Sequence, residues 1–459
     1  MPEVVTPIDP PPADPEVVTT RCDKCGVRSP LSSLFTLVKK SSGLSSVCPA
    51  CKRRAGNRLH LVLALFAVGM TLAYFGAAIA TSSPDERTYS WDGMWFPLFL
   101  LFQYVSIIPH ELAHALVARL TGIEVFQISL GYGRVIATHR VRGVVIEIRA
   151  IPGIGTVSGA TLRMSGWRWR RIAFIAAGPL ANAALCAIAL WAAGGLPHRW
   201  NGGHGSEVDL LWLPLALANG VLCVTSLIPR SVQTPAGVSQ SDGSQLRSLL
   251  FKPIASPERR RLAYFQSRGT ILYAARDTHA ATEIATQGLH EFPGDVSLQW
   301  LLANAHQDAG EYAAGRAIML RLLEAHSARD AARAAMLNAL AWADLMLATP
   351  DCLEEAGRAS TEAYSLTPWE ASVKSTRGLA LVELRDAAAA VPLLRKAFRD
   401  ADRREHRALV ACSLALAQSR LGDAKAARRL WDKARRLDCK CELLPRVERE
   451  LQPIALAAP

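Results

Sequence analysis

The sequence predicts a mainly α-helical protein built around a polytopic membrane helix bundle with a small β-rich loop. Three observations support this fold class. Four long apolar runs lie before residue 230, two Cys-x-x-Cys pairs precede the first run, and a helical repeat pattern follows residue 258. Half of the 459 residues are hydrophobic, which is high for a soluble protein. We therefore expect a ribbon-like module before the bundle and an α-solenoid of helix pairs after it.

The amino-terminal segment contains the two cysteine pairs. Residues 1–20 are rich in proline and have little to bury, so we expect a disordered tail there. Cys22 and Cys25 form the first pair, and Cys48 and Cys51 form the second. Two such turns suit one tetrahedral Zn²⁺ with four thiolate ligands, and so short a segment has too little core to fold without a metal. We expect residues 21–55 to form a zinc ribbon, the alternative being unrelated cysteines in a linker.

The four apolar runs are each close to the ~20 residues that cross a membrane. Lys and Arg cluster before the first run and between the second and third, whereas residues 81–94 and 197–208 carry one Arg each. By the positive-inside rule both chain ends lie in the cytoplasm, most simply of a bacterial cell. The net charge of +12 then reports topology, and no nucleic-acid partner is expected. A membrane-embedded domain at 56–252 would contain spans at about 59–80, 95–118, 172–196 and 209–228.

The loop between the second and third runs is β-rich over residues 123–159. Arg142-Gly143 is a candidate hairpin turn within it. Its glycines do not open a helix after a strand, which argues against a nucleotide site. Strands here must lie against protein or in the membrane interface, because open sheet edges cannot face lipid.

The second run contains the motif His110-Glu-Leu-Ala-His114. Residues four apart share one helix face, so both imidazoles can bind one Zn²⁺. Glu111 lies about 100° around the helix, where it could take a proton from a metal-bound water and pass it to a leaving amine. Chance occurrence is the alternative. However, charged side chains at a bilayer centre cost ~2.5–3.5 kcal/mol each and are usually functional. Pro109 is expected to kink this helix.

A catalytic zinc usually has a third protein ligand. The candidates are Asp242, Asp209, His139 and His204. The second run enters from outside, so His110 lies about 22 Å along it, towards the cytoplasmic face. Asp209 and His204 are expected at the opposite face, whereas Asp242 follows the fourth run on the cytoplasmic side. Asp242 is therefore the preferred ligand.

These motifs together resemble the site-2 proteases, the intramembrane zinc metalloproteases of the peptidase M50 type. The resemblance covers about residues 95–250 and includes Leu-Ile-Pro followed by Ser-Asp-Gly. It implies a zinc metalloendopeptidase (EC 3.4.24.-) that cuts a membrane-protein substrate in or next to a transmembrane helix. It also implies that His110, His114 and Asp242 bind the catalytic zinc and that Glu111 is the base.

The third apolar run carries the family's Gly-Pro-x-x-Asn pattern at Gly178, Pro179 and Asn182. Small residues allow close helix packing, and Asn182 could hydrogen-bond the substrate backbone or a neighbouring helix. Two features depart from the family. Ser226 replaces the usual Asn, for which Asn219 is a candidate substitute. The segment at 230–241 is longer than the compact form, which weakens the assignment of Asp242.

The second half of the chain resembles tetratricopeptide repeats over residues 258–445, followed by a tail at 446–459. Units begin near residues 262, 296, 337, 371 and 408, and Gly269, Ala281 and Pro293 fall at characteristic motif positions. Stacked helix pairs form a concave surface suited to a protein or peptide partner. An unrelated helical bundle is the alternative.

Two other function classes compete with the protease. One is a membrane-anchored scaffold with an inactive metal site, which the Ser226 departure favours and the intact Glu111 disfavours. The other is a metal transporter, which is weaker because only one apolar run carries histidines in its lipid-embedded part.

Overall fold

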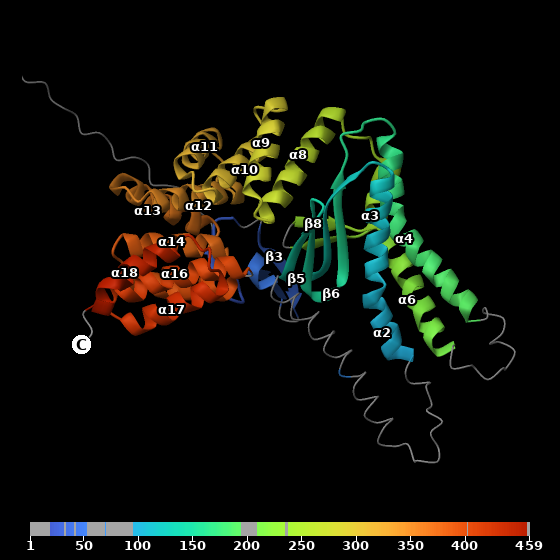
Figure 1. Cartoon of the computed structure of the whole chain (residues 1–459), viewed down its shortest axis with the longest axis horizontal. Helices are drawn as coiled ribbons and strands as arrows, with labels where there is room; N and C mark the ends of the chain where they lie inside the picture. Colours follow the sequence, from blue (N-terminus) through green and yellow to red (C-terminus); the bar gives the residue numbers. More distant parts are fainter. Residues whose placement is uncertain are drawn as a thin grey trace, which may run out of the picture. The chain divides into compact units, whose positions relative to one another are not determined.

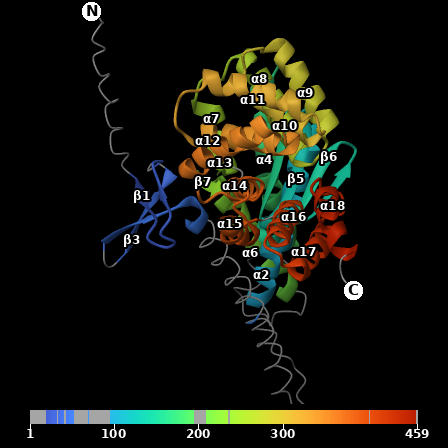
Figure 2. The same ribbon diagram turned by 90° about the vertical axis from the view of Figure 1, so that its left-hand side faces the viewer.

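The computed structural model describes residues 19–31, 34–40, 43–52, 69, 95–193, 209–234, 237–401 and 403–456. Residues 1–18 of the expected tail at 1–20, all of the expected span at 59–80 except residue 69, and His204 lie outside these residues. The chain divides into two compact units. The terminal unit joins residues 1–52 to 323–459, and the central unit comprises 53–322. Figures 1 and 2 show the elements of both units.

Four helices in the central unit are apolar. They are α2 (Trp95–Val105), α3 (Ile107–Leu120), α4 (Trp167–Ala192) and α6 (Asp209–Leu227). Helix α4 packs against both α3 and α6, and α2 packs against α6 (Figure 1). Pro97–Leu120 and Trp167–Ala192 are each long and apolar enough to cross a membrane, whereas the apolar part of α6, Leu211–Leu227, is shorter. Among the described residues, two helices meet this criterion, so the polytopic bundle with four spans stays a prediction.

The junction between α2 and α3 falls at Ser106. Proline has no amide hydrogen, so Pro109 cannot bond the carbonyl of Val105, four residues earlier. The helix is interrupted beside that carbonyl, and helical structure resumes at Ile107, before His110.

The β-rich loop folds as strands β5 (Glu124–Val141) and β6 (Val144–Ala160). The predicted Arg142-Gly143 turn is confirmed: Val141 pairs with Val144, and both turn residues have positive φ. Each strand also folds back. Residues 127–130 pair with 155–158 on one side and with 145–148 on the other, and 145–148 also pair with 137–140. Segment 145–148 is therefore interior to the sheet.

The long segment after α6 is also a hairpin. Strand β7 (Ser231–Thr234) pairs with β8 (Gly237–Gln240), and α7 (Asp242–Phe251) follows directly. The amide of Ser241 donates to the carbonyl of Arg230 at 2.9 Å, so the two ends of the hairpin lie next to each other. The extra residues leave the position of α7 close to the end of α6.

Two antiparallel helix pairs complete the central unit. They are α8 (Pro257–Ala274) with α9 (Thr278–Glu291), and α10 (Val296–Asp308) with α11 (Tyr312–Ala325), whose end passes into the terminal unit. The side chains of Ser256, Asp277 and Asp295 cap the first three helices, as their residue types favour. Phe126 of β5 packs into the core of the first pair against Tyr264 and Phe265.

The terminal unit continues the helix pairs. They are α12 (Ala331–Leu347) with α13 (Pro350–Leu366), α14 (Ala371–Glu383) with α15 (Ala387–Asp400), and α16 (Arg404–Arg420) with α17 (Ala424–Leu437). These pairs bear out the prediction of helical repeats. Residues expected to form a tail instead form α18 (Leu444–Leu456), because Val447 and Leu451, one turn apart, are buried against the preceding helices.

The amino-terminal segment belongs to the same unit. It forms two small hairpins, β1 (Thr20–Arg21) with β2 (Arg28–Ser29), and β3 (Thr36–Lys40) with β4 (Gly43–Val47) (Figure 2). Trp369, between α13 and α14, packs against Cys22, Val47 and Cys48. The Ser29 hydroxyl donates to the carbonyl of Leu366 at 2.8 Å. The ribbon thus packs against the helical repeats.

Candidate metal centres

The structure brings His110, His114 and Asp242 together, with all their candidate ligand atoms within 4.8 Å of one another. His110 Nε2 lies 3.2 Å from His114 Nε2 and 3.2 Å from Asp242 Oδ2, and His114 Nε2 lies 3.7 Å from Asp242 Oδ1. Zn–N bonds of 2.0–2.1 Å in a tetrahedron imply ligand separations of about 3.3 Å. The three atoms therefore have the spacing of three corners of a zinc site.

The far side of each imidazole shows which proton state suits this arrangement. His114 Nδ1 lies 2.7 Å from the carbonyl oxygen of Phe174, so this nitrogen must carry the hydrogen. His110 Nδ1 lies 2.9 Å from Asn182 Oδ1. In neutral imidazoles held this way, both Nε2 atoms present lone pairs to the same point. Lone pairs at 3.2 Å repel, so the donor set fits a cation.

Asp242 adds a third acceptor to this point. Burial raises the pKa of its carboxyl, but the adjacent His110 and His114 side chains outweigh burial and hold the pKa below its ordinary value. The side chain is therefore an anion at neutral pH, the form that binds metal.

Gly178 of α4 leaves the space that the two imidazoles face. A Cβ at this position would lie 2.3 Å from His114 Nε2 and 2.5 Å from His110 Nε2. Only glycine allows the helix backbone this close to the ring nitrogens. Pro179 and Asn182 are also buried on α4, so the Gly-Pro-x-x-Asn pattern serves contact between helices at this site.

Asp242 is positioned by its two neighbours in the chain. Ser241 caps α7 by accepting from the Ser244 amide, and its hydroxyl donates to the carbonyl of Ile228 at 2.8 Å. A Cβ on Gly243 would lie 1.8 Å from the carbonyl oxygen of Leu227. The start of α7 is thereby fastened to the end of α6.

Glu111 lies one residue from His110 on α3 and is 4% exposed. A Cβ on Gly155 of β6 would lie 2.3 Å from Glu111 Oε1, so the sheet passes directly over this carboxylate. The arrangement places a buried carboxylate beside the possible metal position, next to a strand.

Ser226 and Asn219 are polar residues of α6 that make different contacts. Ser226 donates to the carbonyl of Cys223 in its own helix at 3.0 Å. Asn219 is fully buried and donates to the Ser106 hydroxyl at 3.0 Å, at the α2–α3 junction. Asn219 therefore joins two helices and lies in a different contact from the one between α3 and α4.

Among the other third-ligand candidates, His139 is not part of this cluster. His139 is exposed on β5, and its backbone pairs with Ile146. The metal-ligating group found among the described residues does not include it. Asp209 begins α6.

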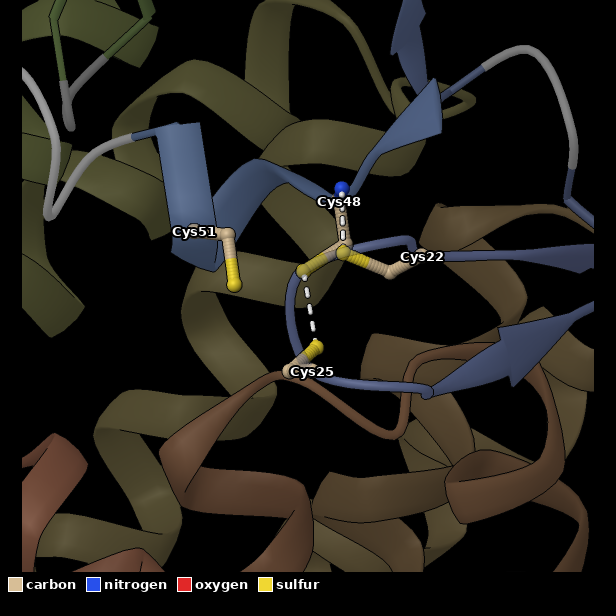
Figure 3. Close-up of side chains that lie close together, drawn as sticks. All are labelled: Cys22, Cys25, Cys48 and Cys51. Atoms are coloured by element: carbon tan, nitrogen blue, oxygen red, sulfur yellow. Dashed lines mark hydrogen bonds between the residues drawn. The ribbon is translucent and has the colours of Figure 1, made fainter. Parts of the chain in front are cut away.

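The four ribbon cysteines form the second cluster, again with sulfur atoms within 4.8 Å of one another (Figure 3). Cys25 Sγ lies 3.7 Å from Cys48 Sγ. Burial alone would raise the pKa of Cys22, but backbone N–H groups of Cys48, Cys25 and Lys24 outweigh it and lower the pKa to about 7. Burial raises the pKa of Cys51 to about 11. One thiolate is thus available near neutral pH, and a metal ion can ionise the others.

A family comparison decides the class of the protein. The model of peptidase family M50 matches residues 98–418, which is more than half of the chain. The chain belongs to peptidase family M50.

Curated relatives are similar to this member of family M50 over a shorter stretch. Proteins from two strains of Xylella fastidiosa, each named "Putative zinc metalloprotease", are 36% identical over 101 residues. That alignment covers 19% of this chain and 23% of each relative, so the chain spans about a quarter of their length.

Solved structures similar to the M50 chain are repeat proteins. A thermophilic TPR protein of Thermus thermophilus is 22% identical, with 42% of this chain and 99% of that chain covered and a TM-score of 0.33. YrrB, described as a TPR protein with an unusual peptide-binding site, is 12% identical over 45% of this chain and 97% of its own, with a TM-score of 0.28.

Two groups at the His110–His114–Asp242 cluster cannot be read from their motifs in the sequence. Gly155 is one of several glycines in a glycine-rich stretch, and nothing in one sequence says that a strand glycine faces Glu111. Ser241 belongs to the Ser-Asp-Gly motif, and its place before a helix is the signal that could identify it as a cap.

Proposed function

We propose that this M50 peptidase is a zinc metalloendopeptidase that cuts a membrane-protein substrate in or next to a transmembrane helix. The convergence of His110 Nε2, His114 Nε2 and an Asp242 oxygen beside buried Glu111 carries the proposal. A structural metal site would not need an additional buried carboxylate beside its ligands.

Exposure on α3 supports a membrane setting. His110, Glu111 and His114 are buried, while Ile108, Leu112 and Leu116 are between 46% and 59% exposed. These three residues follow each other at a spacing of four, so they form one apolar stripe along the helix. The stripe would face lipid in a multi-pass arrangement, most simply in a bacterial cytoplasmic membrane with the repeats in the cytoplasm.

Each residue of the proposed site would have its own role in peptide-bond hydrolysis. His110, His114 and Asp242 would hold zinc, with Asn182 and the Phe174 carbonyl orienting the two imidazoles. Bound zinc would polarise a peptide carbonyl and would lower the pKa of a bound water to about 7. Glu111 accepts the proton of the attacking water and delivers it to the leaving amine. Glu111 needs no large movement for this, because its carboxylate is already buried beside the two ligands.

Substrate entry involves the β5–β6 sheet. A transmembrane helix bonds its own backbone, so it must unwind before its peptide bond can react. An unwound segment could pair with a sheet edge. Residues 144–150 include the interior segment 145–148, whereas 155–160 pair on one side with 124–130 and begin beside Glu111. We therefore place the docking edge at 155–160.

The remaining parts would serve stability and recognition. Cys22, Cys25, Cys48 and Cys51 would hold a second, structural zinc ion, because thiolates at this spacing suit a closed tetrahedral site. The helix pairs would bind a protein or peptide partner.

Replacing Glu111 by Gln tests the catalytic role. The variant keeps the shape of the side chain but cannot accept a proton, so uncut membrane-protein substrates should accumulate in cells, as proteomics can detect. Zinc content should stay at the wild-type value because the three ligands remain. Glu147→Gln is the matched control, since Glu147 is also a 4% exposed carboxylate of the central unit but is paired with Arg149.

The scaffold alternative makes the opposite prediction. If Glu111→Gln cells contain the same membrane-protein fragments as wild-type cells, the site does not catalyse proteolysis. If Glu147→Gln accumulates the same proteins as Glu111→Gln, a general loss of folding explains both.

A further inference from the structure

The surface between α15 and α17 contains a cavity of about 470 Å³ with an unusual charge distribution. Helix α16 packs against both α15 and α17 (Figure 2). The floor of the cavity is apolar and includes Pro392, Leu414 and Leu430. Four of its eight lining residues are basic and none is acidic: Arg395, Lys396, Arg399 and Lys433. We call this feature the basic groove.

The cations of the basic groove have no carboxylate partners in the described part of the chain. Arg395, Lys396 and Arg399 are exposed and make no ion pair there. Elsewhere in the same unit the chain does supply partners: Arg420 pairs with Glu383 and Glu450. The unpaired charges therefore mark a place where a ligand's anionic groups would be favourable.

Two cations lie close to one aromatic ring of the groove. The Lys433 ammonium lies 4.4 Å from the centre of the Phe398 ring, and the Arg407 guanidinium lies 4.8 Å from it. Holding two cations near one ring is repulsive unless anions compensate. The groove therefore favours a ligand that combines carboxylates with apolar side chains.

We propose that the acidic amino-terminal segment of this same chain, residues 1–18, binds the basic groove. The segment contains four carboxylates, at Glu3, Asp9, Asp14 and Glu16, and no Lys or Arg. Its apolar residues suit the floor: Val4, Val5, Ile8, Val17 and Val18. The proposal does not depend on the catalytic one.

The tether makes this binding favourable. Strand β1 begins at Thr20, and the ribbon is fixed beside α13 and α14 through Ser29 and Trp369. Eighteen extended residues reach up to ~60 Å, whereas neighbouring helices lie ~10 Å apart. A tether of this length gives an effective concentration of about 1 mM. An intrinsic Kd of ~0.1 mM would then keep the groove about nine-tenths occupied.

Competition with a labelled peptide tests the proposal. A fluorescent peptide of residues 1–18 is titrated into the detergent-purified full-length chain and into a chain lacking residues 2–18. We expect about tenfold weaker binding to the full-length chain, because its own segment competes. Equal affinity for the two chains would overturn the proposal. A full-length chain with Glu3→Gln, Asp9→Asn, Asp14→Asn and Glu16→Gln should bind the peptide like the shortened chain.

Charge reversal locates the binding site. Arg395→Glu with Arg399→Glu in the shortened chain should abolish peptide binding. The matched control is Arg321→Glu with Arg329→Glu, which changes the net charge equally at exposed residues outside the groove. Peptide binding that survives the groove variant would overturn the proposal. So would a groove that binds vesicles with anionic lipid but not the peptide, since the groove would then be a membrane contact.

Discussion

Replacing Gly178 by Ala should empty the catalytic metal centre without unfolding the protein. The new Cβ would lie 2.3 Å from His114 Nε2, whereas ordinary contacts begin at 3.4 Å, so the imidazole or helix α4 must retreat by 1.1 Å. A displacement of about 1 Å in an active site costs ~100-fold in rate, and disturbed orientation of a ligand costs ~10–100-fold in metal affinity. In contrast, Ala in place of Gly stabilises a helix by ~0.5–1 kcal/mol.

Zinc content and substrate cleavage measure this effect. Wild-type protein should retain two zinc ions per chain after dialysis, and Gly178→Ala should retain one, in the ribbon, with cleavage reduced at least ~100-fold. Gly220→Ala on α6 is the control, because its Cβ would meet only Cys186 Sγ at an ordinary 3.5 Å. A Gly178→Ala protein with two zinc ions and full cleavage would refute the placement of the metal against α4.

Three further predictions follow from the two metal centres and the ribbon contact. Asn182→Ala frees His110 Nδ1 and should lower the affinity of the catalytic centre for zinc ~10–100-fold in chelator competition; an unchanged affinity would show that this hydrogen bond does not orient the ligand. Because burial raises the pKa of Cys51 to about 11 and also raises that of Cys48, zinc uptake by the ribbon near pH 7 should release at least about two protons, and affinity should fall as pH falls. Calorimetry in buffers of different ionisation enthalpy counts these protons, and fewer than two would contradict the assignment. Trp369→Ala removes a 4% exposed ring and should cost ~3–5 kcal/mol, with faster labelling of the ribbon thiols; labelling at the rate of Trp300→Ala, whose ring is 39% exposed, would argue against the contact.

The sequence predicted which segments form helices and turns better than it predicted which segments pair or pack with each other. Apolar length located α3, α4 and α6, and the Arg142-Gly143 pair located a turn, because both are local properties of the chain. The folding back of β5 and β6 was not predictable, since alternation identifies a strand but not which of two neighbours it pairs with. Helix α18 was missed because a short segment at a chain end gave little periodicity before its burial by α16 was known.

The cluster of His110, His114 and Asp242 shows the same limit. The four-residue spacing of His110 and His114 predicts a shared ligand face wherever the helix lies. The choice of Asp242 needed an argument about membrane sidedness, and the length of 230–241 counted against it. The extra residues form a closed hairpin, and no single residue in the segment predicts this. The contacts of Gly178 and Gly155 depend on how closely α4 and β6 approach α3, and this distance is a tertiary property.

The contact between the ribbon and the repeats has a consequence for biosynthesis. Ser29 and Leu366 are 337 positions apart, so the ribbon leaves the ribosome long before its docking surface exists. At about 5–20 residues per second, the interval is roughly 15–70 s. During that interval Cys22 and Cys48 lack the Trp369 ring that later covers them. A newly made ribbon would then depend on its four thiols capturing a metal early to remain folded until the last repeats are translated.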